Sequence, residues 1–291
     1  MRLHILHQTR YLYRREVHLQ PHRLMLTPRD AHELRVLSRS LHCSSGGVIG
    51  WAQDMFGNLV ATATFNMMAD SLVIINELVV EQSAPLWPII PIAPSAHQYP
   101  FHYSPAELFD LAPMRSSNDS DDHGRLDTWA HGFIRGSSTD TLALLNDINI
   151  GVADTIGYRT RNDEGTQTPM ETLALSTGSC RDLAALFIEA VRRLGFAARA
   201  VSGYLFDPDA DSSAAGATHA WAEVYLPMAG WIAFDPTQRH MGSAHLVPVA
   251  TGRCNEQIMP VTGGYVGAAE DAVGMTVEVT VHHIGQNPSD L

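Results

Sequence analysis

The first 82 residues alternate aromatic or β-branched side chains with polar ones, which is the period-two pattern of half-buried β-strands. Residues 7–13 show this alternation clearly, and residues 72–80 form a further apolar run. A turn at residues 54–58, with Gly57 and Asn58, separates two more apolar runs. These signals predict a small antiparallel β-sandwich at the start of the chain.

A proline-rich stretch follows this predicted sandwich. Six prolines lie between residues 84 and 105: Pro85, Pro88, Pro91, Pro94, Pro100 and Pro105. Their density disfavours regular structure and predicts a semi-rigid connector, while the apolar residues between them indicate packing against a domain. We therefore expect an N-terminal β domain at 1–84, a connector at 85–105 and a catalytic domain with a C-terminal β region at 106–291.

Helical patterns begin beyond the connector. A short helix is expected at 105–111, followed by a polar loop at 116–124. The period of a helix returns in the segment 139–156, where apolar residues lie mostly three or four positions apart. These residues are Leu142, Leu145, Ile148, Val152 and Ile156.

A second amphipathic helix is predicted around residues 180–194. Its apolar residues, Leu183, Leu186, Phe187, Ala190, Val191 and Leu194, fall on one face. Ser179 is the expected N-cap, Asp182 occupies the capping-box position and Gly195 ends the helix. Cys180 then lies in the first turn, where free backbone N–H groups and the helix dipole favour a thiolate and can stabilise an oxyanion. A free cysteine is also a common buried packing residue, so its position alone leaves both roles open.

Strand patterns after this helix supply partners for the cysteine. Strands are expected at 196–206, 218–226 and 231–235, with an acidic loop at 207–217. Adjacent strands can present His219 and Asp235 side by side, which is the geometry of a base and its orienting carboxylate. His219 would take the thiol proton and pass it to the leaving amine, while Asp235 would fix the imidazole tautomer.

Three short motifs in this region resemble those of bacterial transglutaminase-like proteins. They are Gly178-Ser179-Cys180-Arg181-Asp182, His219-Ala220-Trp221-Ala222-Glu223 and Asp235-Pro236-Thr237. The segments 7–13 and 54–58 are similar to the N-terminal domain that accompanies this core in bacteria, and 252–253 and 263–265 are similar to its C-terminal β region. Cys180, His219 and Asp235 match the family's nucleophile, base and orienting acid.

The resemblance implies an α+β fold, with a papain-like or transglutaminase-like core in which the cysteine helix packs on an antiparallel sheet, preceded by the β-sandwich. It also implies a thioester intermediate formed from an amide or peptide carbonyl. Hydrolysis of a peptide, amide or isopeptide bond is the function we expect. Two alternatives stay open: a protein-glutamine acyltransferase, and a peptide-binding module without turnover.

Residues beyond the triad give weaker signals. Trp221 and Glu223 share a strand face with His219 and are candidates for substrate binding, although a half-buried strand face explains them equally well. Gln167 and Tyr158 are both candidates for a second oxyanion donor. The run 207–211 resembles the start of a calcium loop, but Ser212 and Thr218 stand where the EF-hand pattern needs Gly and Glu.

Composition narrows the function classes further. The net charge of −12 disfavours a nucleic-acid partner, and all 19 basic residues other than histidine are arginine, so the chain contains no lysine. The 15 histidines lack the Cys/His spacing of a zinc site, and Cys43 and Cys254 are expected to be packing residues without a disulfide framework. No membrane segment or signal peptide is evident, so we expect a cytoplasmic protein that needs no metal or cofactor.

Overall fold

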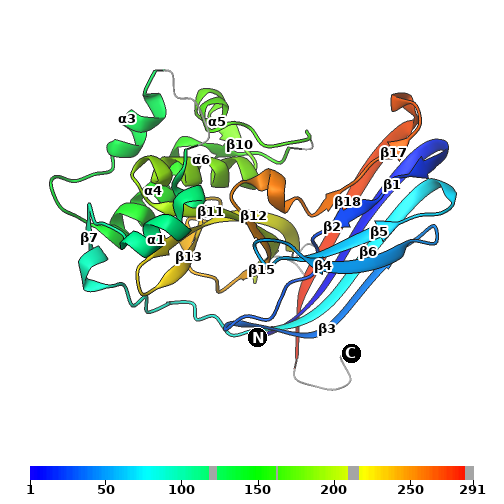
Figure 1. The fold of residues 1–291 in the computed structure, drawn as a ribbon, viewed down its shortest axis with the longest axis horizontal. Helices are drawn as coiled ribbons and strands as arrows, with labels where there is room; N and C mark the ends of the chain where they lie inside the picture. The colour runs from blue at the N-terminus through cyan, green and yellow to red at the C-terminus, as the bar shows by residue number, and fades with distance from the viewer. Residues whose placement is uncertain (118–122, 162, 209–215, 286–291) are drawn as a thin grey trace.

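In the computed structural model, described for residues 1–117, 123–161, 163–208 and 216–285, two groups of elements lie side by side. One group consists of long twisted strands, and the other consists of helices packed on a second antiparallel sheet (Figure 1). Parts of two expected loops, residues 118–122 and 209–215, lie outside the described residues. None of the described helices is long and apolar enough to cross a membrane.

The strand group is a two-layered antiparallel structure. The larger sheet has the order β17 (Tyr265–Val266), β1 (Arg2–Leu19), β6 (Met68–Gln82) and β3 (Leu34–Cys43), and β18 (Ala272–Ile284) pairs with β1 as well. The smaller sheet has the order β16 (Val261–Thr262), β2 (His22–Leu24), β5 (Leu59–Thr64) and β4 (Val48–Gln53). The strands expected at 7–13 and 72–80 lie within β1 and β6, and the turn at 54–58 joins β4 to β5.

Apolar residues from both layers form the core of this sandwich. Leu19, Leu24, Ala63 and Ile74 pack there with Cys43, which is almost completely buried. Burial raises the pKa of the Cys43 thiol to about 11, so this cysteine stays protonated and packs as a small apolar side chain.

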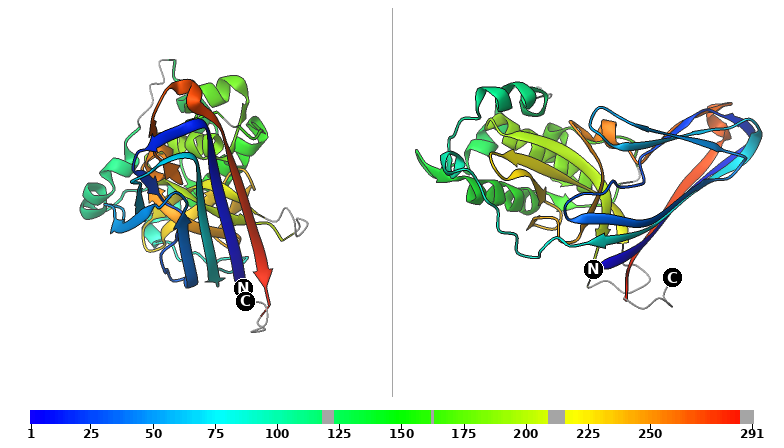
Figure 2. Two further views of the ribbon diagram at one scale, coloured as in Figure 1. Left: turned by 90° about the vertical axis from the view of Figure 1, so that its right-hand side faces the viewer. Right: turned by 60° about the horizontal axis from the view of Figure 1, so that its bottom comes forward.

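The C-terminal strands complete the N-terminal sheets. β18 pairs with β1 from Arg2↔Ile284 to Tyr13↔Ala272, and β16 pairs with β2. Figure 2 shows β1 and β18 side by side, and the start of β1 lies at the same end of the sheet as the end of β18. The division based on sequence had grouped this region with the catalytic part, because alternation identifies a strand without identifying its partner.

The second sheet supports the helices. Its order is β14 (His240–Met241), β13 (Gly230–Asp235), β12 (Gly216–Leu226), β11 (Ala197–Phe206) and β15 (Leu246–Gly252), with every neighbouring pair antiparallel. Two short strand pairs complete the inventory: β7 (Gln98–Tyr99) with β8 (Thr139–Asp140), and β9 (Gly157–Tyr158) with β10 (Thr177–Gly178).

Six α-helices and three 3₁₀ helices are described. They are α1 (Pro105–Asp110), α2 (Ala112–Arg115), α3 (Arg125–His131), α4 (Thr141–Thr155), α5 (Pro169–Leu175), α6 (Cys180–Arg193), η1 (Pro94–Ala96), η2 (Asn255–Ile258) and η3 (Ala269–Asp271). The helices predicted at 105–111, 139–156 and 180–194 are α1, α4 and α6. The expected α+β fold is therefore confirmed.

One apolar core joins all these layers. Leu183, Phe187 and Val191 of α6 pack with Ala222 and Phe234 of the second sheet. The same cluster contains Leu3, Ile5, Leu78 and Val281 from the long strands. Because the core is continuous, the strand group and the helix group are held together by apolar burial as well as by hydrogen bonds.

Phe187 provides a test of this core. Its ring is fully buried and stacks on Phe234 with 5.4 Å between ring centroids. We expect Phe187→Ala to lower the free energy of unfolding by about 3–5 kcal/mol, because it removes the ring and leaves a cavity. Phe109→Ala is the matched control, since Phe109 is 83% exposed, and it should change stability by less than about 0.5 kcal/mol. Urea denaturation measures both, and equal effects would contradict the core assignment.

Candidate active site

Cys180 is the first residue of α6, as the capping pattern predicted. Ser179 precedes it as the N-cap residue, and the Asp182 carboxylate accepts hydrogen bonds from the Ser179 backbone N–H at 2.8 Å and from its hydroxyl at 2.7 Å. The first backbone N–H groups of an α-helix lack partners within the helix, and the helix dipole is positive at this end. In α6 the Asp182 N–H is already bonded to the Ser179 carbonyl at 3.0 Å, which leaves the N–H groups of the residues before it to interact with a negative charge. The thiol therefore lies in a local field that favours its anionic form.

The Asp182 carboxylate also binds groups outside the helix. It is fully buried, and it accepts two hydrogen bonds from Arg161 Nη1, at 2.8 and 2.9 Å, and one from the Gln167 backbone N–H at 2.8 Å. Burial opposes the charge, but the hydrogen bonds from Ser179, Arg161 and Gln167 outweigh it and lower the pKa of Asp182. This carboxylate thus fastens the start of α6 to the segment between β9 and α5.

His219 and Asp235 meet on neighbouring strands. His219 Nε2 lies 2.6 Å from Asp235 Oδ2, and both side chains are almost completely buried. The other carboxylate oxygen, Oδ1, accepts from the backbone N–H groups of Thr237 at 3.0 Å and Gln238 at 3.2 Å. The turn after β13 therefore holds the carboxylate in a fixed orientation toward the imidazole.

The carboxylate determines the charge of the imidazole. Burial by itself would lower the pKa of His219, but the negative charge of Asp235 and its hydrogen bond raise that pKa above the ordinary value, and Cys180 adds to the effect. Because Nε2 is held by Asp235, Nδ1 is the ring nitrogen left for Cys180.

The pKa of the Cys180 thiol is shifted in the opposite direction to that of His219. Burial alone would raise the pKa of Cys180, but the hydrogen bond from His219, the positive charge of its ring and the backbone N–H of Ala220 together lower it. Cys180 as a whole residue remains only partly buried. The arrangement favours a thiolate–imidazolium pair oriented by a carboxylate.

The strand pairing makes the backbone N–H of Ala220 available to the Cys180 thiol. The ladder between β12 and β13 stops at Ala222↔Phe234, whereas the ladder between β12 and β11 continues to Gly216↔Phe206. Ala220 thus lies beyond the part of β12 that β13 covers. Its N–H is directed to the Cys180 thiol instead of to a neighbouring strand.

The structure brings Cys180, His219 and Asp235 together; of the two weaker candidates, Trp221 contacts this group and Glu223 is paired elsewhere. Trp221 is 1% exposed and stacks on the His219 ring, with 6.1 Å between the centroids. Glu223 lies further along β12 and forms an ion pair with Arg199 at 2.6 Å. Neither contact presents a substrate-binding group beside Cys180, and the roles suggested for Trp221 and Glu223 stay predictions.

The two candidates for a second oxyanion donor lie near the start of α6. Tyr158 is 57% exposed and pairs with Gly178, two residues before the cysteine. Gln167 gives its backbone N–H to Asp182, and its side-chain Oε1 accepts from the Thr172 hydroxyl at 3.3 Å. Both stay candidates on these contacts.

Arg161 and Asn255 support the site without having been singled out in the sequence. Arg161 neutralises the buried Asp182, and Asn255 Nδ2 donates to the Arg181 carbonyl at 2.9 Å. Asn255 belongs to η2, far from α6 in the chain. These two contacts could not be predicted from the sequence, because no local pattern specifies a bond between residues that are 21 or 74 positions apart.

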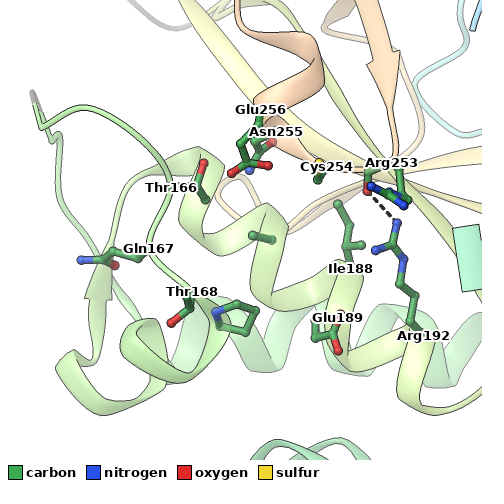
Figure 3. A pocket seen from close by; sticks show the side chains of 12 residues that line it. Thr166, Gln167, Thr168, Ile188, Glu189, Arg192, Arg253, Cys254, Asn255 and Glu256 are labelled. Carbon is green, nitrogen blue, oxygen red and sulfur yellow. Dashed lines mark hydrogen bonds between the residues drawn. The ribbon is translucent and has the colours of Figure 1, made fainter. Parts of the chain in front are cut away.

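A cavity of about 310 Å³ lies on the flank of α6 (Figure 3). Residues from α6, from the segment before α5 and from the loop at η2 line it, among them Glu189, Arg192, Cys254 and Asn255. None of the three triad residues lines this cavity. Within the described residues, no group of three histidine, cysteine or acidic side chains is placed to hold a metal ion.

Two family models match the chain. Residues 127–236 match the model described as the transglutaminase-like superfamily, and residues 3–81 match the bacterial transglutaminase-like N-terminal region. The first match contains Cys180, His219 and Asp235. The resemblance stated from the motifs is thereby confirmed for both parts of the chain.

Individual relatives agree with these matches. An uncharacterized protein of Mycobacterium tuberculosis is 24% identical over 96% of this chain and 92% of its own length. An uncharacterized protein of Mycobacterium leprae is 30% identical over 38% of this chain and 40% of its own length. A crystal structure named "Putative Cysteine Protease" from Cytophaga hutchinsonii superposes with a TM-score of 0.71 and 18% identity, covering 99% of this chain and 93% of that one. The last similarity shows that the fold is shared.

Asp182 provides the stability test of the site. We expect Asp182→Asn to lower the free energy of unfolding by about 3 kcal/mol, because Arg161 loses its buried counter-charge and the helix start loses a charged acceptor. Asp163→Asn is the matched control: Asp163 pairs with the same Arg161 at 3.4 Å but is 80% exposed, so its loss should cost at most about 1 kcal/mol. Equal losses in urea denaturation would contradict the role given to Asp182.

The same carboxylate predicts a pH dependence. Its pKa is lower in the folded protein than in the unfolded chain, so its stabilisation is fully present above the ordinary aspartate pKa of about 3.9. That stabilisation is lost as the pH falls through the lower, folded-state value. The stability difference between wild type and Asp182→Asn should therefore shrink as the pH is lowered from about 5 in denaturation curves. A constant difference down to acid unfolding would contradict this.

Proposed function

Because the chain belongs to the transglutaminase-like superfamily and carries a bacterial transglutaminase-like N-terminal region, we propose that it is a thiol-dependent amidohydrolase. Cys180 is the nucleophile, His219 the general base and acid, and Asp235 the group that orients the imidazole. The observation that carries this proposal is the contact of a half-buried helix-start thiol with an imidazole whose Nε2 lies 2.6 Å from a buried carboxylate.

Acylation would begin with attack of the Cys180 thiolate on the carbonyl carbon of an amide. The new C–S bond converts the carbonyl oxygen to an oxyanion, which the N–H groups at the start of α6 can stabilise. The Nδ1–H of the His219 imidazolium then protonates the leaving nitrogen, the C–N bond breaks, and an amine or ammonia departs. A thioester on Cys180 and a neutral imidazole remain.

Deacylation would use the same groups, with His219 accepting a proton instead of donating one. Neutral His219 accepts a proton from water while the water oxygen attacks the thioester carbon. The C–S bond breaks and releases a carboxylic acid, and the Cys180 thiolate is restored beside the imidazolium. The net reaction is an amide plus water giving an acid plus an amine. Peptide, amide and isopeptide bonds are all compatible with these steps.

Alkylation of Cys180 tests the nucleophile directly. We expect iodoacetamide to modify Cys180 of the wild type at a pH well below the ordinary thiol pKa of about 8.5, because the imidazolium stabilises the thiolate. His219→Ala should move this reactivity to a higher pH, and Asp235→Asn should move it part of the way. Peptide mass spectrometry follows each thiol separately.

Cys254 is an internal reference in the same samples. Burial and the neighbouring Glu256 raise the pKa of the Cys254 thiol, so it should react only at high pH in every variant. If Cys180 of the wild type titrates like Cys254, the nucleophile assignment fails. The chain would then be better described as a peptide-binding module on a transglutaminase-like scaffold.

Whether water or an added amine attacks the thioester distinguishes hydrolysis from acyl transfer. With a glutamine-containing peptide as substrate, we expect the carboxylic acid to remain the main product when methylamine is added. A methylamide product that increases with amine concentration would instead support the acyltransferase alternative. Cys180→Ala is the control for both products and should form neither. The chain has no lysine of its own, so self-crosslinking through a lysine amine cannot obscure the measurement.

A further inference from the structure

His7 and Thr9 of β1 have no part in the chemistry described above, yet both belong to a buried polar network. His7 Nδ1 lies 3.2 Å from the Tyr204 hydroxyl, and His7 Nε2 lies 3.0 Å from the Thr9 hydroxyl. The Tyr204 hydroxyl also donates to the Leu26 carbonyl at 2.9 Å and accepts from Asn76 Nδ2 at 3.2 Å. Tyr204 belongs to β11, whereas its partners come from the N-terminal part of the chain.

One assignment of the hydrogens satisfies all of these contacts at once. A tyrosine hydroxyl has one hydrogen, and that of Tyr204 is directed to the Leu26 carbonyl, so His7 must donate to it from Nδ1. His7 Nε2 is then the acceptor for the Thr9 hydroxyl. Burial lowers the pKa of His7 to about 4, which keeps the ring neutral.

Asn76 completes the network with its amide group. One amide hydrogen goes to the Leu26 carbonyl at 2.9 Å and the other to Tyr204, while its Oδ1 accepts from the Thr27 hydroxyl at 3.0 Å. His7, Asn76 and Tyr204 are each at most 2% exposed. Displacing the N-terminal strands from β11 would leave several buried polar groups without partners, so one docking geometry is strongly favoured.

Tyr204 is directly connected to the strand that carries the proposed base. In the β11–β12 ladder, Tyr204 is opposite Thr218 and Gly203 is opposite His219. Because β13 leaves β12 at Ala222, the segment of β12 around His219 is paired with β11 alone. The position of β11 at residues 203–204 therefore sets the position of the imidazole.

Packing around Gly203 makes this connection rigid. A Cβ at Gly203 would lie 2.1 Å from the Val247 carbonyl oxygen and 2.8 Å from the Trp221 ring. Trp221 in turn stacks on His219. A shift of β11 at this point would be transmitted through Trp221 and through the strand ladder to the same imidazole.

From these contacts we infer that the N-terminal β-structure is part of the active site, because it fixes β11 through Tyr204 and thereby places His219 against Cys180. His7 and Tyr204 are positioning residues for the proposed base. The inference rests on the proposed function, since the placement it explains is that of the Cys180–His219 pair. It assigns a mechanistic role to the N-terminal region.

Tyr204→Phe tests the inference with a matched control. Tyr103 is also buried, and its hydroxyl donates to the Tyr225 carbonyl at 2.8 Å and accepts from the Ala197 N–H at 3.1 Å. Ala197 and Tyr225 are partners on the same two strands, at the end remote from His219. Tyr103→Phe therefore removes hydrogen bonds from the same ladder without touching the network.

The readout is the pH profile of Cys180 alkylation, with melting temperature measured in parallel. We expect Tyr204→Phe to raise the apparent pKa of Cys180 by about one unit, which means roughly tenfold slower alkylation at a pH below that value. Tyr103→Phe should lower the melting temperature but leave the profile unchanged. Thr9→Val is a milder variant that removes only the donor to His7 Nε2, and it should shift the profile in the same direction by less.

The outcomes separate this inference from the proposed function. If wild-type Cys180 already titrates as an ordinary thiol, the proposed function fails and the inference fails with it. If the wild type shows a lowered pKa that depends on His219, but Tyr204→Phe and Thr9→Val keep the wild-type profile, the inference alone is overturned. A shift of equal size in Tyr103→Phe would also overturn it, because the effect would then reflect general destabilisation of the sheet.

Discussion

The buried pair of His219 and Asp235 is the interaction on which the rest of the site depends. An imidazolium in this position is disfavoured by burial, and the carboxylate 2.6 Å away is the main group that stabilises it. The thiolate of Cys180 depends in turn on that imidazolium. Because both charges lie close to an apolar core, each needs a fixed partner, and the surrounding elements are arranged to keep those partners in place.

Two separate anchors meet at the Cys180–His219 contact. On the helix side, Asp182 ties the start of α6 to Arg161 and to the Gln167 backbone. On the sheet side, the β11–β12 ladder and the Tyr204 network hold His219. Strands and a helix packed on them can slide by fractions of an ångström when apolar contacts alone hold them, whereas buried and fully paired polar groups favour one arrangement.

Local patterns in the sequence predicted several of the elements and singled out Cys180, His219 and Asp235 as a candidate triad. The capping residues and apolar face of α6 placed Cys180 in the first helical turn, and the alternation around His219 and Asp235 predicted their strands. Long-range partners were not predictable in this way. The pairing of β18 with β1 and the bonds from Arg161 to Asp182 and from Tyr204 to Leu26 join residues far apart in sequence. Nothing in local periodicity specifies such contacts, because they arise only when the layers pack.

The path of the chain explains why the N-terminal strands and the helix group cannot act as independent units. The polypeptide begins in β1, passes through the entire second sheet with its helices, and returns to pair β18 with β1. Cys180, His219 and Asp235 thus lie, along the chain, between segments that pair with each other in one β-structure. Val281 of β18 and Leu3 and Ile5 of β1 belong to the same apolar core as Phe187 of α6. His7 of β1, the strand with which β18 pairs, also contacts Tyr204 of β11, so the closed β-structure is joined by a buried hydrogen bond to the strand opposite His219.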